Sequence, residues 1–188
     1  MEDLSRLDLQ VFRLIHQTWH QSWLDPIFWA ISSTGLGWVQ SLLAILVALA
    51  FSKGSGFKAR FTDPQFFVWP ILFMVIAYSG TVPQIFKQFS DRERPSNLPW
   101  AVPQETFFHH SFPSGHTTSS FAIAFYLFFV WRGTPRAKWG WVALLWASLV
   151  GFSRIYRGVH WPSDVLGGIA VGLMGAGIAL LIWPPKKP

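Results

Sequence analysis

Three short clusters of polar residues have the types and spacing that chemistry on a phosphate group requires. The first is Lys87 with Arg94–Pro95, in KQFSDRERP, the second is Pro113–His116, in SFPSGHTTS, and the third is Ser153–Asp164, in SRIYRGVHWPSD. Phosphoryl transfer spreads negative charge over the equatorial oxygens of its transition state, so its catalyst must mainly position the reactants and supply positive charge. The three clusters together therefore indicate a phosphoryl-transfer site.

Five residues in these clusters are suited to hold a phosphate. Lys87, Arg94 and Arg154 supply positive charge, and an arginine can bind a phosphate in bidentate fashion. Ser114 and Gly115 are expected to open a helix, where free N–H groups and the positive end of the helix dipole favour an anion. The sequence therefore predicts that Lys87, Arg94, Ser114, Gly115 and Arg154 bind phosphate.

Two histidines and one aspartate are the candidate catalytic residues. His160 lies four residues before Asp164, about one helical turn, so the carboxylate can hold one ring nitrogen protonated and leave the other as a nucleophile. His116 can then protonate the leaving oxygen as a general acid. No carboxylate or histidine cluster has metal-ligand spacing, and three cations can do a metal ion's electrostatic work. We therefore expect neither a metal ion nor a cofactor.

Each cluster taken alone has a simpler explanation. A PSGH sequence often marks a helix start with a capping serine, an Arg-Pro pair is often a turn, and a histidine four residues before an aspartate can be a local hydrogen bond. Chance rarely places all three in this order on one membrane face. The joint pattern therefore favours one shared site.

Other polar residues near the clusters have weaker functional interpretations. His109 and His110 could touch a headgroup, although interfacial residues without a catalytic role are the expected interpretation. Glu105 and Arg92 lie in the long loop before the second cluster, and the default for such residues is a solvated loop. Arg157 is expected near the mouth of the site, with no assigned role.

The composition is that of a polytopic membrane protein. The chain of 188 residues is 51% hydrophobic, 18% aromatic and 13% charged, whereas about a quarter of an average soluble domain is charged. Its 12 tryptophans suit the membrane interface. The net charge is +6, but the sequence contains no basic run of the kind that binds nucleic acid. The sequence has no cysteine, which excludes disulfides, thiolate metal sites and a cysteine nucleophile.

The hydrophobic pattern predicts one all-α domain, a transmembrane helical bundle with about five spans over residues 1–188. Each expected span is close to the roughly 20 residues that cross a bilayer. Gly168, Gly172 and Gly175 have helix-packing spacing, which favours close approach inside the bundle over a dimer face. The expected spans are 36–52, 65–83, 115–131, 138–155 and 164–183.

The first 35 residues are expected to form an interfacial lead-in. Residues 1–24 carry apolar residues at helical spacing, which is typical of an amphipathic helix on the membrane surface. A helix packed on the bundle is the alternative. Residues 25–35 are expected to be a short interfacial segment, and a continuous tilted helix over 26–51 is the alternative. The apolar residues at helical spacing are Leu4, Leu7, Val11, Leu14 and Ile15.

The basic residues predict the orientation. Eight of the 15 lie in residues 53–63, in residues 132–138 and at Lys186 and Lys187, which share one side if five spans alternate. The positive-inside rule makes that side cytoplasmic. We therefore expect a multi-pass protein of the inner or plasma membrane, with the three clusters facing away from the cytoplasm.

The patterns KxxxxxxRP at Lys87, PSGH at Pro113 and SRxxxxxHxxxD at Ser153 resemble the three-part signature of the type 2 phosphatidic acid phosphatase superfamily. This superfamily includes membrane lipid phosphatases and soluble vanadium haloperoxidases. The resemblance spans residues 87–164 and implies a helical bundle whose pocket opens at the outer membrane surface. It implies the same phosphate-binding residues, His160 as nucleophile, His116 as general acid and Asp164 as the orienting carboxylate. The usual membrane member has six spans, one more than counted here.

The function expected from these observations is that of a bacterial membrane lipid phosphatase acting through a phosphohistidine. Its partners would be the bilayer and a phosphorylated lipid of the phosphatidylglycerol phosphate, phosphatidate or undecaprenyl diphosphate class. One alternative is a lipid phosphotransferase. Another is a non-catalytic protein that binds or transports lipid headgroups, although a headgroup sensor would not need both histidines and the aspartate. A flippase would need polar groups near the bilayer midplane, and the apolar spans contain few.

Overall fold

In the computed structural model, the described residues are 2–51, 68–105 and 110–185, and over these ranges the chain contains helices and no strand. This confirms the expected all-helical class. Short π-helical or 3₁₀ turns extend or precede several of the helices. The main helices are α1 (Glu2–Arg13), α2 (Asp25–Ser33), α3 (Gly37–Phe51), α5 (Val68–Leu72), α6 (Ser79–Gln88), α7 (Gly115–Trp131), α8 (Ala137–Tyr156) and α9 (Pro162–Ile182).

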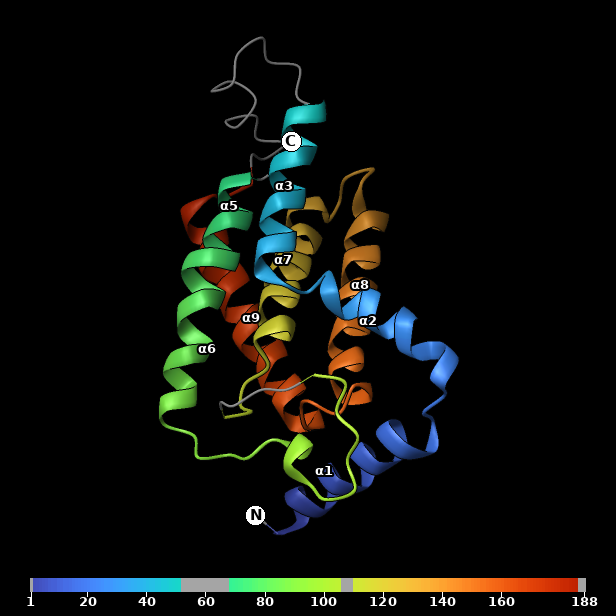
Figure 1. Ribbon diagram of the computed structural model, residues 1–188. Coiled ribbons are helices and arrows are strands. Elements are labelled where there is room, and N and C mark those ends of the chain that lie inside the picture. The colour runs from blue at the N-terminus through green and yellow to red at the C-terminus, as the bar shows by residue number, and fades with distance from the viewer. Residues whose placement is uncertain (1, 52–67, 106–109, 186–188) are drawn as a thin grey trace.

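Five helical segments form an elongated bundle, in which α7 lies between α8 and α9 and contacts both (Figure 1). Helices α5 and α6 are joined through the π-helical stretch Phe73–Tyr78, so they form one continuous helical rod beside α3 and α9. Buried Met74, Tyr126 and Ala176 belong to one core cluster between these elements. The core is thus assembled from apolar faces of three separate segments.

Close contact between α7 and α9 depends on glycine. A Cβ atom added at Gly168 would lie 2.8 Å from the Cβ of Thr117, and one added at Gly172 would lie 2.8 Å from the carbonyl oxygen of Thr118. Real Cβ atoms do not approach this closely, so any larger residue would push the two helices apart. The expectation that these glycines serve packing inside the bundle is confirmed, and the close approach brings the starts of α7 and α9 together.

The helices match the five expected segments within a few residues, but fewer of them satisfy a length and hydropathy test for crossing a membrane. Val68–Gln88 and Pro162–Ile182 do so individually. Ser22–Ser33 and Gly37–Ala50 do so only as a pair, which is bent by 65°. The protein therefore has at least two candidate spans, and the number five stays a prediction.

The bend between α2 and α3 contradicts the alternative of one continuous helix over 26–51. The chain turns at Thr34–Leu36, where the N–H of Gly35 donates to the carbonyl of Ser32 at 2.9 Å. A Cβ at Gly35 would lie 2.6 Å from Cγ1 of Val150, so α8 packs directly against this turn. In Figure 1, α2 consequently lies across the bundle while α3 runs along it.

The N-terminal segment packs on the bundle through an aromatic and polar face. Phe12 and Ile15 are buried in a cluster with Tyr156 of α8 and Val165 of α9. His16 continues this face: its Nδ1 lies 2.8 Å from the carbonyl oxygen of Tyr156, and its Nε2 accepts the N–H of Val102 at 3.1 Å. The alternative of a helix packed on the bundle is therefore correct for this face.

The opposite face of α1 carries the leucines that the sequence pattern singled out. Leu4 is 61% exposed, Leu7 is 55% exposed and Leu14 is 41% exposed. These positions share one side of a helix because three to four residues complete a turn. These leucines leave an apolar stripe exposed, as an amphipathic helix on the membrane surface would have, and that placement stays a prediction.

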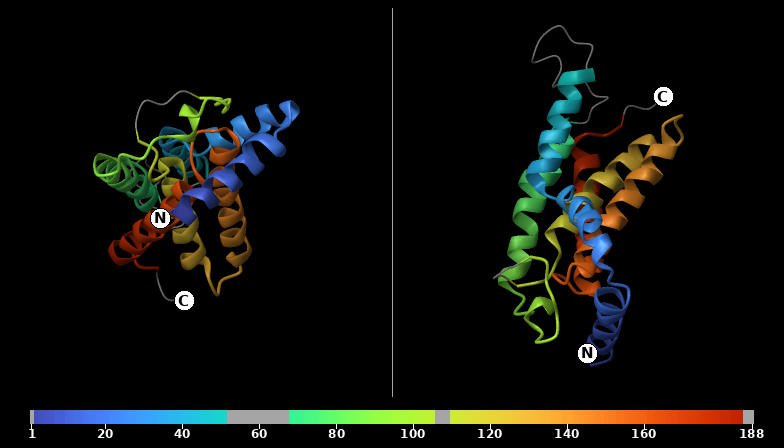
Figure 2. Two further views of the ribbon diagram at one scale, coloured as in Figure 1. Left: turned by 90° about the horizontal axis from the view of Figure 1, so that it is seen from below. Right: turned by 45° about the vertical axis from the view of Figure 1, so that its right-hand side comes forward.

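The two ends of the bundle differ in character. The turn between α7 and α8, which carries Arg132 and Arg136, lies at the end opposite α1 and the long loop that precedes α7 (Figures 1 and 2). Residues 53–63, Lys186 and Lys187, which also entered the orientation argument, lie outside the described residues. The tertiary structure thus places one of the three basic segments away from the polar clusters.

Candidate active site

All three polar clusters meet at the end of the bundle nearest α1. Lys87 ends α6, Arg94 lies in the following loop, and Ser114 immediately precedes α7. Arg154 lies in the last turn of α8, and Asp164 lies in the first turn of α9. Each cluster lies at a helix end because Gly, Pro and Ser residues interrupt the apolar segments there. The alternation of helix direction then brings these ends together.

Asp164 holds one ring nitrogen of His160. Its Oδ2 lies 3.4 Å from Nδ1 of His160, and both side chains are buried. The same carboxylate accepts the backbone N–H of Trp161 at 2.9 Å, Nη1 of Arg92 at 2.9 Å and the hydroxyl of Ser111 at 3.4 Å. A buried carboxylate with this many donors is fixed in orientation. It therefore directs the Nδ1–H of the imidazole inward and turns Nε2 toward the cations.

The second ring nitrogen of His160 faces Arg94. Nε2 lies 3.3 Å from Nη1 of Arg94, which also donates to the carbonyl of Val159 at 2.8 Å. Burial lowers the pKa of His160 well below its usual value, and the positive charges of Arg154, Arg94 and Lys87 lower it further. A neutral imidazole at neutral pH keeps a lone pair on Nε2, as a nucleophile requires.

Arg94 and Arg154 are both buried. Burial, together with the charge of Arg154, lowers the pKa of Arg94 to about 10, which still leaves it protonated at neutral pH. Nη1 of Arg154 donates to the hydroxyl of Ser32 at 2.5 Å. Both Nη atoms of Arg154 bind Glu105, at 3.0 and 2.9 Å, in the bidentate geometry that an arginine also offers to a phosphate.

Glu105 joins two arginines of the third cluster. Besides binding Arg154, it forms an ion pair with Nη1 of Arg157. Burial alone would raise the pKa of Glu105, but the hydrogen bond from Arg154 and the charges of Arg154, Arg157 and Arg94 outweigh it, so the pKa lies below its usual value. Glu105 is therefore ionised at neutral pH and neutralises part of this cationic cluster.

The start of α7 leaves space for a ligand. Ser114 is the N-cap residue, but its side chain makes no capping hydrogen bond, and its Oγ instead accepts the hydroxyl of Thr117 at 2.9 Å. The interpretation of PSGH as an ordinary serine cap is therefore wrong.

A Cβ at Gly115 would meet nothing within 4 Å, so packing does not require a glycine there. The ring of His116 packs beside Gly35, whose added Cβ would lie 3.2 Å from its Cδ2.

The sequence interpretation missed the roles of Arg92 and Glu105. Neither is a solvated loop residue: Arg92 pairs with both Asp8 and Asp164, and Glu105 pairs with Arg154. The one available signal was that a carboxylate such as Asp164, at a membrane boundary, needs a partner. That partner could not be chosen among several nearby arginines, because Arg92 and Asp164 are far apart along the chain.

The remaining polar candidates are placed as follows. His109 lies outside the described residues, and His110 contributes its backbone carbonyl to Nη2 of Arg94 at 3.4 Å. Nε of Arg157 donates to Oε1 of Gln104 at 3.2 Å. Within the described part of the chain, no group of three or more His, Cys, Asp or Glu side chains could hold a metal ion.

Comparison with known proteins identifies relatives over most of the chain. The family model described as the PAP2 superfamily matches residues 67–188. A phosphatidylglycerophosphatase B of Bacillus subtilis is 33% identical over 82% of this chain and 72% of its own length. A lipid A 4'-phosphatase of Porphyromonas gingivalis is 29% identical over 93% of this chain and 72% of its own length.

Shorter and structural matches agree with this assignment. An undecaprenyl-diphosphatase of Bacillus subtilis is 44% identical over 34% of this chain, and the match spans only 31% of that protein's length. The crystal structure of Aquifex aeolicus LpxE is 28% identical with a TM-score of 0.74, over 93% of this chain and 95% of that one. The whole bundle is therefore shared with a solved bacterial protein.

Proposed function

Because the chain belongs to the PAP2 superfamily, we propose that it is a metal-independent membrane lipid phosphatase that works through a phosphohistidine. The observation that carries the proposal is the arrangement around His160. Its Nδ1 is held by Asp164, and its Nε2 faces Arg94 at the open start of α7. A headgroup sensor would need the cations but would not need a buried imidazole with one nitrogen tied to a carboxylate.

In the first step, Nε2 of His160 attacks the phosphorus as the bond to the leaving oxygen breaks. Arg94, Arg154, Lys87 and the first N–H groups of α7 stabilise the charge on the equatorial oxygens. His116 gives its proton to the leaving oxygen. Asp164 stabilises the imidazole ring, which carries positive charge once its second nitrogen is bonded to phosphorus.

In the second step, water attacks the phosphorus of the phosphohistidine. His116, now deprotonated, accepts a proton from that water, the phosphorus–nitrogen bond breaks, and inorganic phosphate leaves. His160 returns to its neutral form with the Nδ1–H still directed at Asp164. The enzyme is thus restored without a cofactor, and water is the only co-reactant.

The proposed substrate is a phosphorylated membrane lipid. Candidates are phosphatidylglycerol phosphate, phosphatidate and an isoprenyl diphosphate such as undecaprenyl diphosphate. The similarity to a phosphatidylglycerophosphatase and to an undecaprenyl-diphosphatase supports a lipid phosphate ester or a diphosphate. The relatives also support a phosphorylated glycolipid, since one is a lipid A 4'-phosphatase. We further propose five spans, with the active site on the extracytoplasmic side of the inner or plasma membrane.

The test is phosphate release by the purified full chain from a panel of phospholipids, isoprenyl diphosphates and lipid A. We expect release from at least one substrate and none from the His160→Ala variant. His110→Ala is the matched control, because that histidine is exposed and its backbone carbonyl makes the contact with Arg94. Full activity in His160→Ala would contradict the proposed mechanism, and release from no member of the panel would contradict the function.

A further inference from the structure

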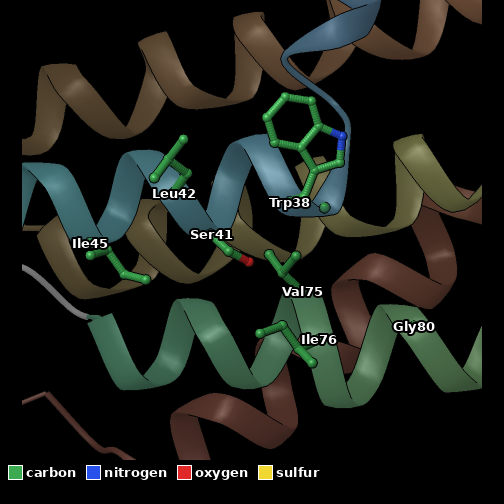
Figure 3. Close-up of a pocket in the computed structure, with 8 residues that line it drawn as sticks. Trp38, Ser41, Leu42, Ile45, Val75, Ile76 and Gly80 are labelled. Carbon is green, nitrogen blue, oxygen red and sulfur yellow. The ribbon is translucent and has the colours of Figure 1, made fainter.

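An apolar cavity of about 580 Å³ lies between α3 and the rod formed by Phe73–Tyr78 and α6. Figure 3 shows Ser41 of α3 pointing toward Val75 of the other helix, with Trp38 near the start of α3. Trp38 is 67% exposed and Ile76 is 62% exposed, so the cavity opens sideways from the bundle. Eight residues line it: Gly37, Trp38, Ser41, Leu42, Ile45, Val75, Ile76 and Gly80.

Both walls of this cavity lead to the candidate active site. Gly80 lies seven residues before Lys87 in α6, so the two share a face about 10 Å apart along the helix axis. Gly37 begins α3 two residues after Gly35, which packs against the ring of His116. The helix of one wall therefore continues to a proposed phosphate ligand, and the chain before the other wall passes beside the proposed general acid.

The direction of the reaction places the lipid on the same side. The nucleophile and the leaving oxygen lie roughly in line on opposite sides of the phosphorus. His160 occupies one side, so the leaving oxygen, which receives its proton from His116, points to the other side. That oxygen carries the lipid, and the hydrocarbon chain must therefore leave the site along the His116 side, toward the turn that precedes α3.

We infer that this cavity binds the hydrocarbon chain of the lipid substrate and selects for chain length. The inference rests on the proposed function. Gly37, Ser41 and Gly80 have no side chain or a small one, which leaves space between the two helices. Among the eight lining residues, only Ser41 carries a hydroxyl group. An apolar surface of this kind suits a hydrocarbon chain and disfavours a polar group.

The decisive variant fills the cavity from α6. A Cβ at Gly80 would lie 3.8 Å from the carbonyl oxygen of Val75, an ordinary contact, so Gly80→Leu can be accommodated without displacing the backbone. Gly177→Leu is the matched control, because Gly177 lies in α9 and its added Cβ would meet nothing within 4 Å. Both changes put a leucine on an exposed helical position, but only one lies in the cavity.

The assay compares kcat/KM for two lipid phosphates with the same headgroup, one with long chains and one with six-carbon chains. Gly80→Leu should lower kcat/KM for the long-chain substrate by roughly 10- to 100-fold, in line with the effect of misfit in an apolar pocket. It should leave the short-chain substrate unchanged, and Gly177→Leu should change neither. Trp38→Ala, which removes a wall without adding bulk, should also reduce the preference for long chains.

The outcomes separate the inference from the function on which it rests. If wild-type protein hydrolyses both substrates and neither Gly80→Leu nor Trp38→Ala changes their ratio, the cavity does not bind the chain. If Gly177→Leu changes the ratio as strongly as Gly80→Leu, the effect belongs to the membrane-facing surface in general, and the inference fails. If the wild type hydrolyses neither substrate nor any other lipid phosphate, the proposed function itself fails.

A separate observation concerns α1. Asp8 is 4% exposed, forms an ion pair with Nη2 of Arg92 and accepts the N–H of Ser163 at 2.9 Å. Nη1 of Arg92 binds Oδ1 of Asp164 at 2.9 Å, while Oδ2 of Asp164 faces His160. Two carboxylates from opposite ends of the chain therefore share one guanidinium, directly behind the nucleophile.

We propose that Asp8 and Arg92 are positioning residues for His160. By holding Oδ1 of Asp164, Arg92 keeps Oδ2 directed at Nδ1 of the imidazole, and Asp8 keeps Arg92 in place. Removing a partner that orients a functional group in this way typically lowers activity by about 10- to 100-fold.

The test measures the rate of phosphoenzyme formation in the first turnover, normalised to the amount of enzyme that becomes labelled. Asp8→Asn should lower this rate by roughly 10-fold or more while leaving KM within about twofold. Asp8→Glu, which keeps the charge, should recover most of the rate. A loss of labelled enzyme at an unchanged rate would indicate a purely structural role for Asp8 and overturn the proposal, as would failure of Asp8→Glu to recover more than Asp8→Asn.

Discussion

Replacing Glu105 with glutamine tests whether a carboxylate competes with phosphate for Arg154. Both Nη atoms of Arg154 are bound to Glu105, at 3.0 and 2.9 Å, and the side chain of Arg154 is only 1% exposed. A phosphate that uses the same two donors must displace the carboxylate. Glu105→Gln keeps the shape of the side chain, removes its charge and leaves one oxygen to accept a hydrogen bond.

The magnitude follows from the bond that is lost. A hydrogen bond to a charged group contributes about 1.5–3 kcal/mol, and glutamine replaces one of the two accepting oxygens with an amide donor. Displacing the side chain should therefore cost about 1.5–3 kcal/mol less, which is roughly a 10- to 100-fold gain in affinity for a phosphate-like anion. Tighter phosphate binding should also slow product release and lower kcat.

The assay is inhibition by vanadate, which can mimic five-coordinate phosphorus, measured with thermal unfolding in the presence and absence of vanadate. Asp25→Asn is the matched control, because Asp25 binds Gln104 and His20 in the same region but makes no ion pair with Arg154 among the described residues. Glu105→Gln should bind vanadate more tightly than wild type, and Asp25→Asn should not. An unchanged or weaker vanadate affinity in Glu105→Gln would refute the competition.

The stability of the same variant has a defined dependence on pH. The folded-state pKa of Glu105 is lower than its value in the unfolded chain, so ionised Glu105 stabilises the fold above the usual glutamate range. That contribution is lost as the pH falls through the lowered folded-state pKa. Wild type should therefore be more stable than Glu105→Gln at neutral pH without vanadate, and the difference should shrink progressively below pH of about 4.5.

The remaining predictions concern catalysis and topology. Activity should survive excess chelator; loss restored by magnesium would contradict metal-independent catalysis. In intact cells, a membrane-impermeant thiol reagent should label a cysteine at Asn97, in the loop before α7, but not one at Pro135, between α7 and α8; the reverse pattern would overturn the orientation. His160→Ala should form no phosphoenzyme with any substrate. His116→Ala should lose about 100- to 10,000-fold in the first turnover of a lipid phosphomonoester but less with an aryl phosphate, which needs less help from an acid, and equal losses would contradict its role.

Much of the architecture could be predicted because its causes are local. The start of α7 at Gly115 follows from Pro113 and Ser114, and its end near Trp131 follows from the basic, Gly- and Pro-containing turn behind it. The residues of the candidate site could also be identified from the sequence. Arginine, lysine and histidine are unusual beside long apolar helices, so their presence there indicates a function. Helix direction alone then predicts that Lys87, Ser114 and Asp164 meet at one end.

The break at Gly35 shows where local reasoning ends. The stretch from 26 to 51 is apolar enough to continue as one helix, and the turn at Thr34–Leu36 is stabilised by packing against Val150 of α8 and the ring of His116. Tertiary packing also decides which face of the N-terminal segment lies on the bundle. Leu4 and Leu7 form the more regular stripe, but the shape offered by α8 and α9 accepts Phe12 and Ile15.

The sequence by itself determined the helical segments, the clusters and the type of chemistry, because these depend on residue types and on spacings within one or two helical turns. Only the tertiary structure decided that Arg92 binds Asp8 and Asp164, and that Glu105 binds Arg154. A charge in a loop can pair with any of several opposite charges within reach of the folded chain. Which pair forms depends on the distances between helix ends, and those distances are set by packing across the whole bundle.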